Sequence, residues 1–362
     1  MILPESSNSG GQARPAKATA RGHHPLARYL ATRLGLSVLL VFGVTLVTFV
    51  LTNLVPADPV QAALGEQAAA DPQIVAQFRK QAGLDQPLPV QYVNYLGRLL
   101  TGNLGTSNQT RLPVSQEIAK AFPATAELAL VAILISIVIG VALGLWAALR
   151  RRRAADHVIR AVSLVGLSIP TFWLALLMYY IFFFKLRIFP GSGRLSPTAI
   201  APPHVTGLYT VDSLLAGQLD NFADALSHLI LPALVLALYT VGLLTRFSRS
   251  SVLDVLNQDF VKAAKAKGLP ARVVVTRYVL RGALVPIITI VGLAFGSLLS
   301  GTVLVEKVFA WHGIGEYAFT AATKLDLPAV MGVGLVVGIV YIGINFLVDV
   351  LYGVIDPRVR IQ

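Results

Sequence analysis

The sequence of 362 residues contains no cysteine and few charged side chains. The absence of cysteine excludes a disulfide framework, a thiolate nucleophile and a metal site with cysteine ligands. Charged residues make up only 13% of the chain, whereas soluble domains usually have about a quarter. Hydrophobic residues make up 55%, and the mean hydropathy is +0.69. This composition indicates an integral membrane protein.

Patterns that mark common catalytic sites are also absent. The chain has no Gly-x4-Gly-Lys-Ser/Thr loop for nucleotide phosphates, no His-Glu-x-x-His and no Gly-x-Ser-x-Gly. Its six histidines are scattered, and none lies deep in an apolar run. We therefore predict no catalytic residue, metal site or cofactor in this chain, and a membrane enzyme is the least favoured interpretation.

Six apolar runs are long enough to cross a bilayer, because a spanning helix needs about 20 residues. They are Leu34–Leu54, Thr125–Leu149, Ala161–Phe184, Leu229–Thr245, Pro286–Val305 and Ala329–Tyr352. The predicted fold class is an all-α integral membrane protein with six transmembrane helices. Pro170 lies inside the third run and is expected to kink it.

Basic residues are unevenly distributed among the segments that connect these runs. Twenty of the 30 Lys and Arg residues lie in residues 1–33, 150–160, 246–285 and 353–362. These segments share one side of the membrane if the runs cross it in alternating directions. Since short cytoplasmic segments are enriched in Lys and Arg, we predict that both termini are cytoplasmic. The net charge of +12 is then a signal of topology, and nucleic-acid binding is not needed to explain it.

Two segments outside the runs have a distinct character. Residues 1–27 are rich in Gly, Ser, Ala, Arg and Pro and are predicted to be a disordered cytoplasmic tail, followed by a transmembrane domain over residues 28–362. Residues 55–124 form an extracytoplasmic segment in which Ile74–Gln81 and Val90–Leu100 have helical spacing of apolar residues. This pattern predicts a small helical segment between the first two spans.

Only two ionisable residues lie within the apolar runs. Glu127 follows Thr125 in the first turn of its predicted helix, where the helix dipole favours a carboxylate. Asp349 lies near the cytoplasmic end of the last run, within reach of Arg358 or of the interface. We interpret both as helix-end electrostatics. This argues against an ion-coupled carrier, in which an intramembrane carboxylate would serve the ion pathway.

The polar segment 246–285 contains a short basic helix followed by a glycine. Asn257 or Asp259 can cap the start of the helix, and Gly268 can end it in the left-handed conformation. The residues that fall on adjacent turns between these ends are Phe260, Ala263, Ala264 and Lys267. The two alanines form a small surface that a groove on a partner could accept. A basic cytoplasmic loop without any partner fits the composition equally well.

A second basic helix is predicted after Pro270, which is well suited to begin a helix. Arg272, Arg277 and Arg281 recur along it with apolar residues between them. This pattern is typical of an amphipathic helix that lies at the membrane interface, and we expect it to lead into the fifth span at Pro286.

The first helix of this segment carries a family resemblance. The pattern Lys262-Ala263-Ala264-x3-Gly268 resembles the glutamate-alanine-alanine loop of ABC importer permeases. Lys262 stands where that family usually has Glu, which puts in doubt any contact that needs the carboxylate. The late apolar-x-Pro element, Leu284-Val285-Pro286, is similar to the dipeptide/oligopeptide branch of these permeases.

Other stretches resemble the same branch in the same order along the chain. They are Gly83–Tyr92, Gly102–Ser107, Gly166–Trp173, Glu306–Glu316 and Asp356–Arg358. His312 departs from the family pattern, in which a proline is common. The resemblance covers about residues 28–360.

The resemblance implies a multi-pass permease subunit in a bacterial cytoplasmic membrane that moves dipeptides or oligopeptides. It implies four kinds of contact: a second homologous permease, two ATP-binding subunits that hold ATP and Mg, an extracytoplasmic substrate-binding protein, and the lipid bilayer. The residues it assigns to contact with the ATPase are Asp259, Phe260, Ala263, Ala264, Lys267, Gly268 and Leu269. The alternatives are an ion-coupled secondary transporter or channel, or the same fold carrying nickel, glutathione or another small solute.

Overall fold

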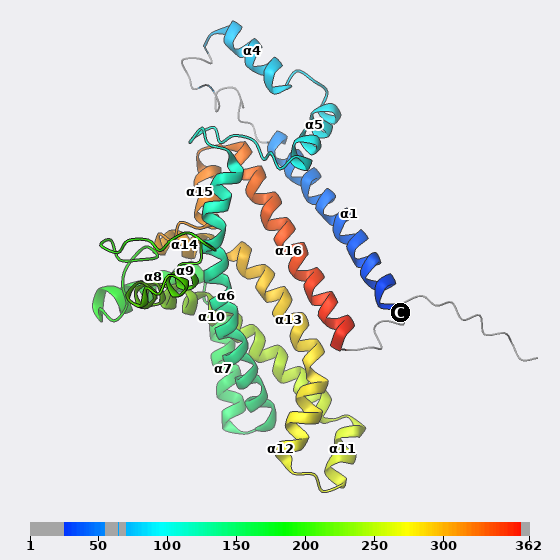
Figure 1. The fold of residues 1–362 in the computed structure, drawn as a ribbon. Helices are drawn as coiled ribbons and strands as arrows, with labels where there is room; N and C mark the ends of the chain where they lie inside the picture. Colours follow the sequence, from blue (N-terminus) through cyan, green and yellow to red (C-terminus); the bar gives the residue numbers. More distant parts are fainter. Residues whose placement is uncertain (1–24, 55–63, 65–69, 356–362) are drawn as a thin grey trace, which may run out of the picture.

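The computed structural model describes residues 25–54, 64 and 70–355, and these residues form helices joined by loops, the longest of which runs over residues 186–208 (Figure 1). No β-strand occurs in this part of the chain. The all-α class is therefore confirmed. Most of the predicted disordered tail, residues 1–27, lies outside the described residues.

Within the described residues, five helical segments are long and apolar enough to cross a membrane without a break. Three of them are α1 (Pro25–Leu54), α6 (Val114–Leu149) and α10 (Leu219–Leu256). The fourth joins α12 (Ala271–Val273), η2 (Val274–Val279) and α13 (Leu280–Gly301), and the fifth is α16 (Leu327–Ile355).

The third predicted span is a bent pair. Helix α7 (Ala154–Ser168) ends at Ile169, and α8 (Thr171–Met178) continues into η1 (Tyr179–Lys185) at an angle of 99°. Proline disfavours helical geometry at the preceding residue, and Ile169 is indeed extended, with φ −80° and ψ 125°. Pro170 therefore causes a sharp break, and the count of six spans holds only when this pair is one span.

Helix α6 begins eleven residues earlier than predicted, because Pro123 lies inside the helix and does not begin it. Glu127 is therefore not in the first turn, and the interpretation of this carboxylate through the helix dipole is wrong. The fourth predicted span is similarly longer than expected, since α10 has 38 residues with Pro232 inside it.

Helices α6 and α10 form the centre of the bundle and approach closely. A Cβ atom added at Gly144 would lie 2.7 Å from Ser248 Cβ and 2.8 Å from the carbonyl oxygen of Thr245. Small residues let helix backbones approach in lipid, where packing contributes most of the association energy. This contact therefore requires glycine.

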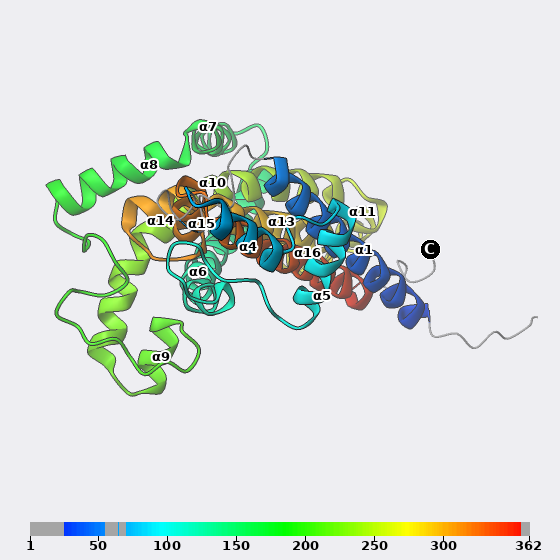
Figure 2. The same ribbon diagram turned by 90° about the horizontal axis from the view of Figure 1, so that it is seen from above.

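Helices α1 and α16 pack side by side along one flank (Figure 1). Arg33 near the start of α1 pairs with Asp349 near the end of α16 at 3.3 Å. The predicted contact between Asp349 and Arg358 is untested, since Arg358 lies outside the described residues. In the view from above (Figure 2), α8 and α9 (Tyr209–Leu215) lie at the far end of the molecule from α1.

The shorter helices lie at the two ends of the bundle. Helices α4 (Pro72–Ala82) and α5 (Leu88–Leu100) lie at one end and correspond to the two helices predicted between the first spans (Figure 1). Helix α11 (Asp259–Ala266) lies at the opposite end. The start of α1 and the end of α16 also lie toward the α11 end.

Candidate functional site

Gln258 directly precedes α11, and its extended backbone, with φ −71° and ψ 148°, makes it the N-cap residue. Neither Asn257 nor Asp259 caps the helix, contrary to prediction. Asp259 is already the first helical residue, so its carboxylate accepts a hydrogen bond of 2.9 Å from Lys262 Nζ instead. The hydrogen bond and charge of Lys262 hold the pKa of Asp259 below its usual value.

The predicted glycine end of α11 is present. Gly268 has φ +73°, in the left-handed region, and its N–H donates to the carbonyl of Lys265. The N–H of Leu269 donates to the carbonyl of Ala264 at 3.3 Å. These two bonds form a Schellman motif, which stops the helix and satisfies its last carbonyls.

The inner face of α11 is fixed against the rest of the chain. Val261 and Ala264 are buried in an apolar cluster that includes Val252 of α10, Val279 of η2 and Ala283 of α13. Leu269 packs against the same cluster. Val261, which the sequence prediction omitted, is the most buried residue of α11. The buried face of α11 therefore contacts two membrane-spanning segments, α10 and the continuous η2–α13 segment.

The outer face of α11 is exposed and basic. Ala263 is exposed whereas Ala264 is buried, so the two alanines do not form one surface as predicted. Phe260 is 48% exposed and its ring edge lies next to Gly282. The exposed residues of this outer face are Asp259, Phe260, Lys262, Ala263, Lys265, Ala266 and Lys267. Such a face, with one aromatic ring and three ammonium groups, suits a protein surface with acidic residues and an apolar pocket.

The second basic helix differs from its prediction. Helix α12, η2 and α13 follow one another without a break, and Pro286 lies inside α13. Arg272, Arg277 and Arg281 are exposed at the α11 end of this continuous span. There is accordingly no separate interfacial helix.

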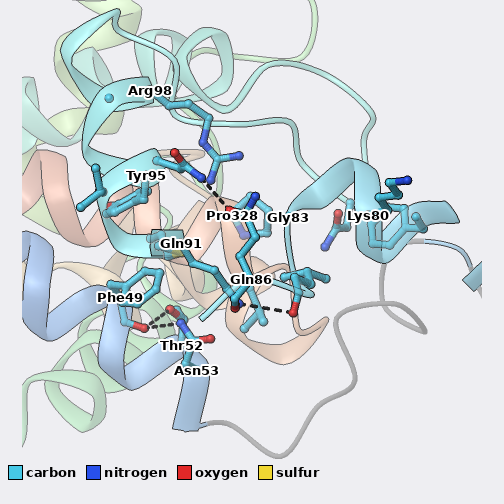
Figure 3. Close-up of a pocket in the computed structure, with 18 of the residues that line it drawn as sticks. Phe49, Thr52, Asn53, Lys80, Gly83, Gln86, Gln91, Tyr95, Arg98 and Pro328 are labelled. Atoms are coloured by element: carbon cyan, nitrogen blue, oxygen red, sulfur yellow. Dashed lines mark hydrogen bonds between the residues drawn. The ribbon is translucent and has the colours of Figure 1, made fainter. Parts of the chain in front are cut away.

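A second candidate site lies at the opposite end of the bundle. A cavity of about 950 Å³ opens between the end of α1, the helices α4 and α5, and the start of α16 (Figure 3). Its polar lining includes Asn53, Lys80, Gln91 and Arg98. Burial raises the pKa of Tyr95, another lining residue, to about 12. This set of amide, cationic and aromatic groups can bind a polar solute, and the sequence contained no pattern that would have predicted it.

The buried carboxylate of Glu127 has a structural partner. Arg194 Nη2 lies 2.7 Å from Glu127 Oε2, and its guanidinium group stacks over the ring of Tyr209 at 3.6 Å. The backbone N–H and the hydroxyl of Thr210 also donate to Glu127. Glu127 therefore joins α6 to α9 and to the loop before it, and its oxygens are occupied by protein donors.

The sequence matches two family models. Residues 140–361 match the family described as "Binding-protein-dependent transport system inner membrane component", and residues 26–129 match the corresponding N-terminal membrane component. The two matches together include α11 and all the residues that line the cavity beside α4 and α5.

Curated relatives align along nearly their whole lengths. The chain is 46% identical to the probable D,D-dipeptide transport system permease protein DdpB of Escherichia coli K12 over 89% of this chain and 94% of the relative. It is 44% identical to the di/tripeptide permease protein DppB of Pseudomonas aeruginosa, and 40% identical to the dipeptide permease protein DppB of Alkalihalophilus pseudofirmus. Both alignments cover 92% of this chain and 99% of the relative. The chain therefore belongs to the family of inner-membrane components of binding-protein-dependent transport systems, and it is a multi-pass transport subunit of that membrane.

Proposed function

We propose that this chain is the permease subunit of an ATP-driven importer of dipeptides or oligopeptides, and that α11 is its contact with an ATPase subunit. The observation that carries this proposal is the division of α11 into two faces. One face is fixed on the ends of two spanning helices through Val261 and Ala264, and the other face is exposed. The peptide substrate follows from the names of the relatives.

The position of α11 suits contact with a cytoplasmic ATPase. It lies at the same end as the start of α1, the end of α16 and the four consecutive arginines at residues 150–153. If the positive-inside rule applies, this end faces the cytoplasm. The cavity beside α4 and α5 then faces outward, where a substrate-binding protein would deliver peptide.

The buried contacts of α11 provide a route by which movement of an ATPase subunit could reach the spanning helices. A shift of the ATPase would displace α11 as a rigid unit, because the Schellman motif and the buried Val261 and Ala264 hold its geometry. The same cluster includes residues of α10 and α13, so these helices would move with it. The spans would then alternate between outward-facing and inward-facing arrangements.

The nucleotide chemistry is assigned to partner subunits. The chain has no phosphate-binding loop, so we propose that ATP and Mg bind to two ATPase subunits and that this chain holds no cofactor. A second homologous permease and a substrate-binding protein would complete the importer. Nickel, glutathione or another small solute is the alternative cargo.

The coupling role is tested with Ala263→Trp in the complete complex. Ala263 is exposed, so the larger ring should leave the fold of this chain unchanged while blocking close approach of a partner. We expect the ATPase subunits to be lost on purification, or peptide-stimulated ATP hydrolysis to fall about tenfold or more. A tenfold loss of affinity corresponds to about 1.4 kcal/mol, which is within the range for a substitution at the centre of an interface.

The matched control is Ala322→Trp, an exposed alanine on α15 (Ile314–Thr323) in the outer half of the structure. This variant should retain its ATPase subunits. If Ala263→Trp complexes also retain them and hydrolyse ATP at the original rate, α11 is not the contact. Transport by this chain alone, driven by an ion gradient, would contradict the whole proposal.

A further inference from the structure

A second cavity, of about 480 Å³, lies between α7 and α10. This cavity lies toward the α11 end of the bundle. The last α10 residue that lines it is Ser250, six positions before the end of α10, and α11 is the next helix along the chain. The lining residues are Arg160, Ser163, Leu164 and Leu167 of α7 and Thr245, Arg246, Arg249 and Ser250 of α10. The coupling role proposed above makes no use of this cavity.

The cavity carries uncompensated positive charge. Asp156 binds both Nε and Nη2 of Arg249, so one of the three guanidinium groups is neutralised. Arg160 and Arg246 form no ion pair with any residue that the structure describes, and both are exposed at the cavity. Two guanidinium groups on facing helices are a favourable arrangement for a phosphate, which accepts paired hydrogen bonds from each group.

Apolar side chains adjoin the charged mouth. Leu164 and Leu167 follow Arg160 by four and seven positions, so the three residues share the face of α7 that lines the cavity, and Leu164 is exposed. The arginines at 150–153 form the turn before α7, and Arg160 lies about 10 Å along the helix from Arg153. Charged side chains at the membrane surface beside an apolar stripe match the two parts of a phospholipid.

We propose that this cavity binds the phosphate group of an anionic phospholipid, with its acyl chains along Leu164 and Leu167 of α7. Basic pockets between membrane helices on the cytoplasmic side are suited to such head groups. A free phosphate ion shares the same recognition chemistry, but it would make no use of the apolar side chains of Leu164 and Leu167.

Native mass spectrometry of the purified complex, in nanodiscs that contain cardiolipin or phosphatidylglycerol in phosphatidylcholine, tests the proposal. The wild-type complex should retain anionic lipid. Arg160→Gln/Arg246→Gln should weaken this retention about tenfold or more, since each basic residue near an anionic membrane surface contributes about 1 kcal/mol. The charge-conserving pair Arg160→Lys/Arg246→Lys should keep part of it, and a complex with this pair remains measurable if the glutamine pair does not assemble.

The control variant is Arg272→Gln, an exposed arginine at the same end of the bundle but outside the cavity. It should retain lipid as the wild type does. Leu164→Ser separates the two phosphate sources: it should weaken lipid retention, and inorganic phosphate should compete poorly with the lipid in the wild type. Equal lipid retention in the wild type and the glutamine pair would overturn the assignment. Full displacement of the lipid by phosphate, with phosphate binding unchanged by Leu164→Ser, would overturn it as well.

Discussion

The carboxylate of Asp156 accepts two hydrogen bonds from the guanidinium group of Arg249, at 2.6 Å to Nε and 2.8 Å to Nη2. Asp156 also accepts the backbone N–H of Arg152, a residue with φ +64° in the turn between α6 and α7. One buried carboxylate thus joins that turn to α10, 93 positions further along the chain.

Replacing Asp156 by Asn should separate α7 from α10. The amide cannot match both donors of Arg249, and removing one partner of a buried ion pair costs about 3–5 kcal/mol. We expect the lower value, since Arg249 is partly exposed. Denaturant unfolding of the purified chain measures the loss. The exposed Asp254→Asn on α10 is the control, and equal stability of the two variants would contradict this role.

Glu127→Gln should destabilise the chain by leaving Arg194 buried without a carboxylate. The expected cost is about 3 kcal/mol, and Arg194→Gln in the same chain should recover part of it, because the remaining buried charge is then removed. A double-mutant cycle of unfolding free energies provides the measurement. Additive effects of the two substitutions would show that the 2.7 Å contact contributes nothing.

Gly268→Ala should weaken the end of α11 through backbone conformation alone. A Cβ atom at Gly268 meets nothing within 4 Å, but its φ of +73° costs an alanine about 1 kcal/mol. Gly343 in α16 is the comparison, since its added Cβ also meets nothing and its φ is not positive. Gly343→Ala should stabilise slightly. Hydrogen exchange of residues 259–269 should increase only in the first variant; protection equal to that of the wild type would refute the strain.

Acid should open the loop around Asp212. Burial alone raises the pKa of this carboxyl, but hydrogen bonds from Thr206 and from the N–H groups of Gly207 and Val205 outweigh burial and lower it below 3.8. A carboxyl with a lowered pKa stabilises the folded state above its ordinary pKa and loses that contribution as pH falls through the folded value.

Proteolysis or hydrogen exchange of residues 204–216 should therefore be constant from neutral pH to about pH 4 and rise below it. Asp212→Asn should raise exchange at neutral pH and remove the acid transition. The exposed Asp220→Asn should preserve the wild-type profile. An unchanged acid transition in Asp212→Asn would assign it to another group.

Local residue chemistry determined several elements before any fold was known. The apolar runs predicted the spanning helices because twenty apolar residues in a row have few other stable environments. Gly268 predicted a helix end in the left-handed conformation, and its φ is positive at the end of α11. Pro170 predicted a kink, although only the structure showed a bend of 99°. Conversely, Pro123 lies inside a helix that packing sustains, so a proline alone did not locate the start of α6.

The sequence by itself determined that this is a helical membrane protein with a basic, glycine-terminated helix, because hydropathy, charge and backbone preference are properties of neighbouring residues. Only the tertiary structure decided that Glu127 pairs with Arg194, that Ala264 is buried while Ala263 is exposed, and that Arg160 faces Arg246 across a cavity. These relationships join residues that are distant along the chain or distinguish two faces of one turn. They depend on how helices pack, and no local pattern encodes that packing.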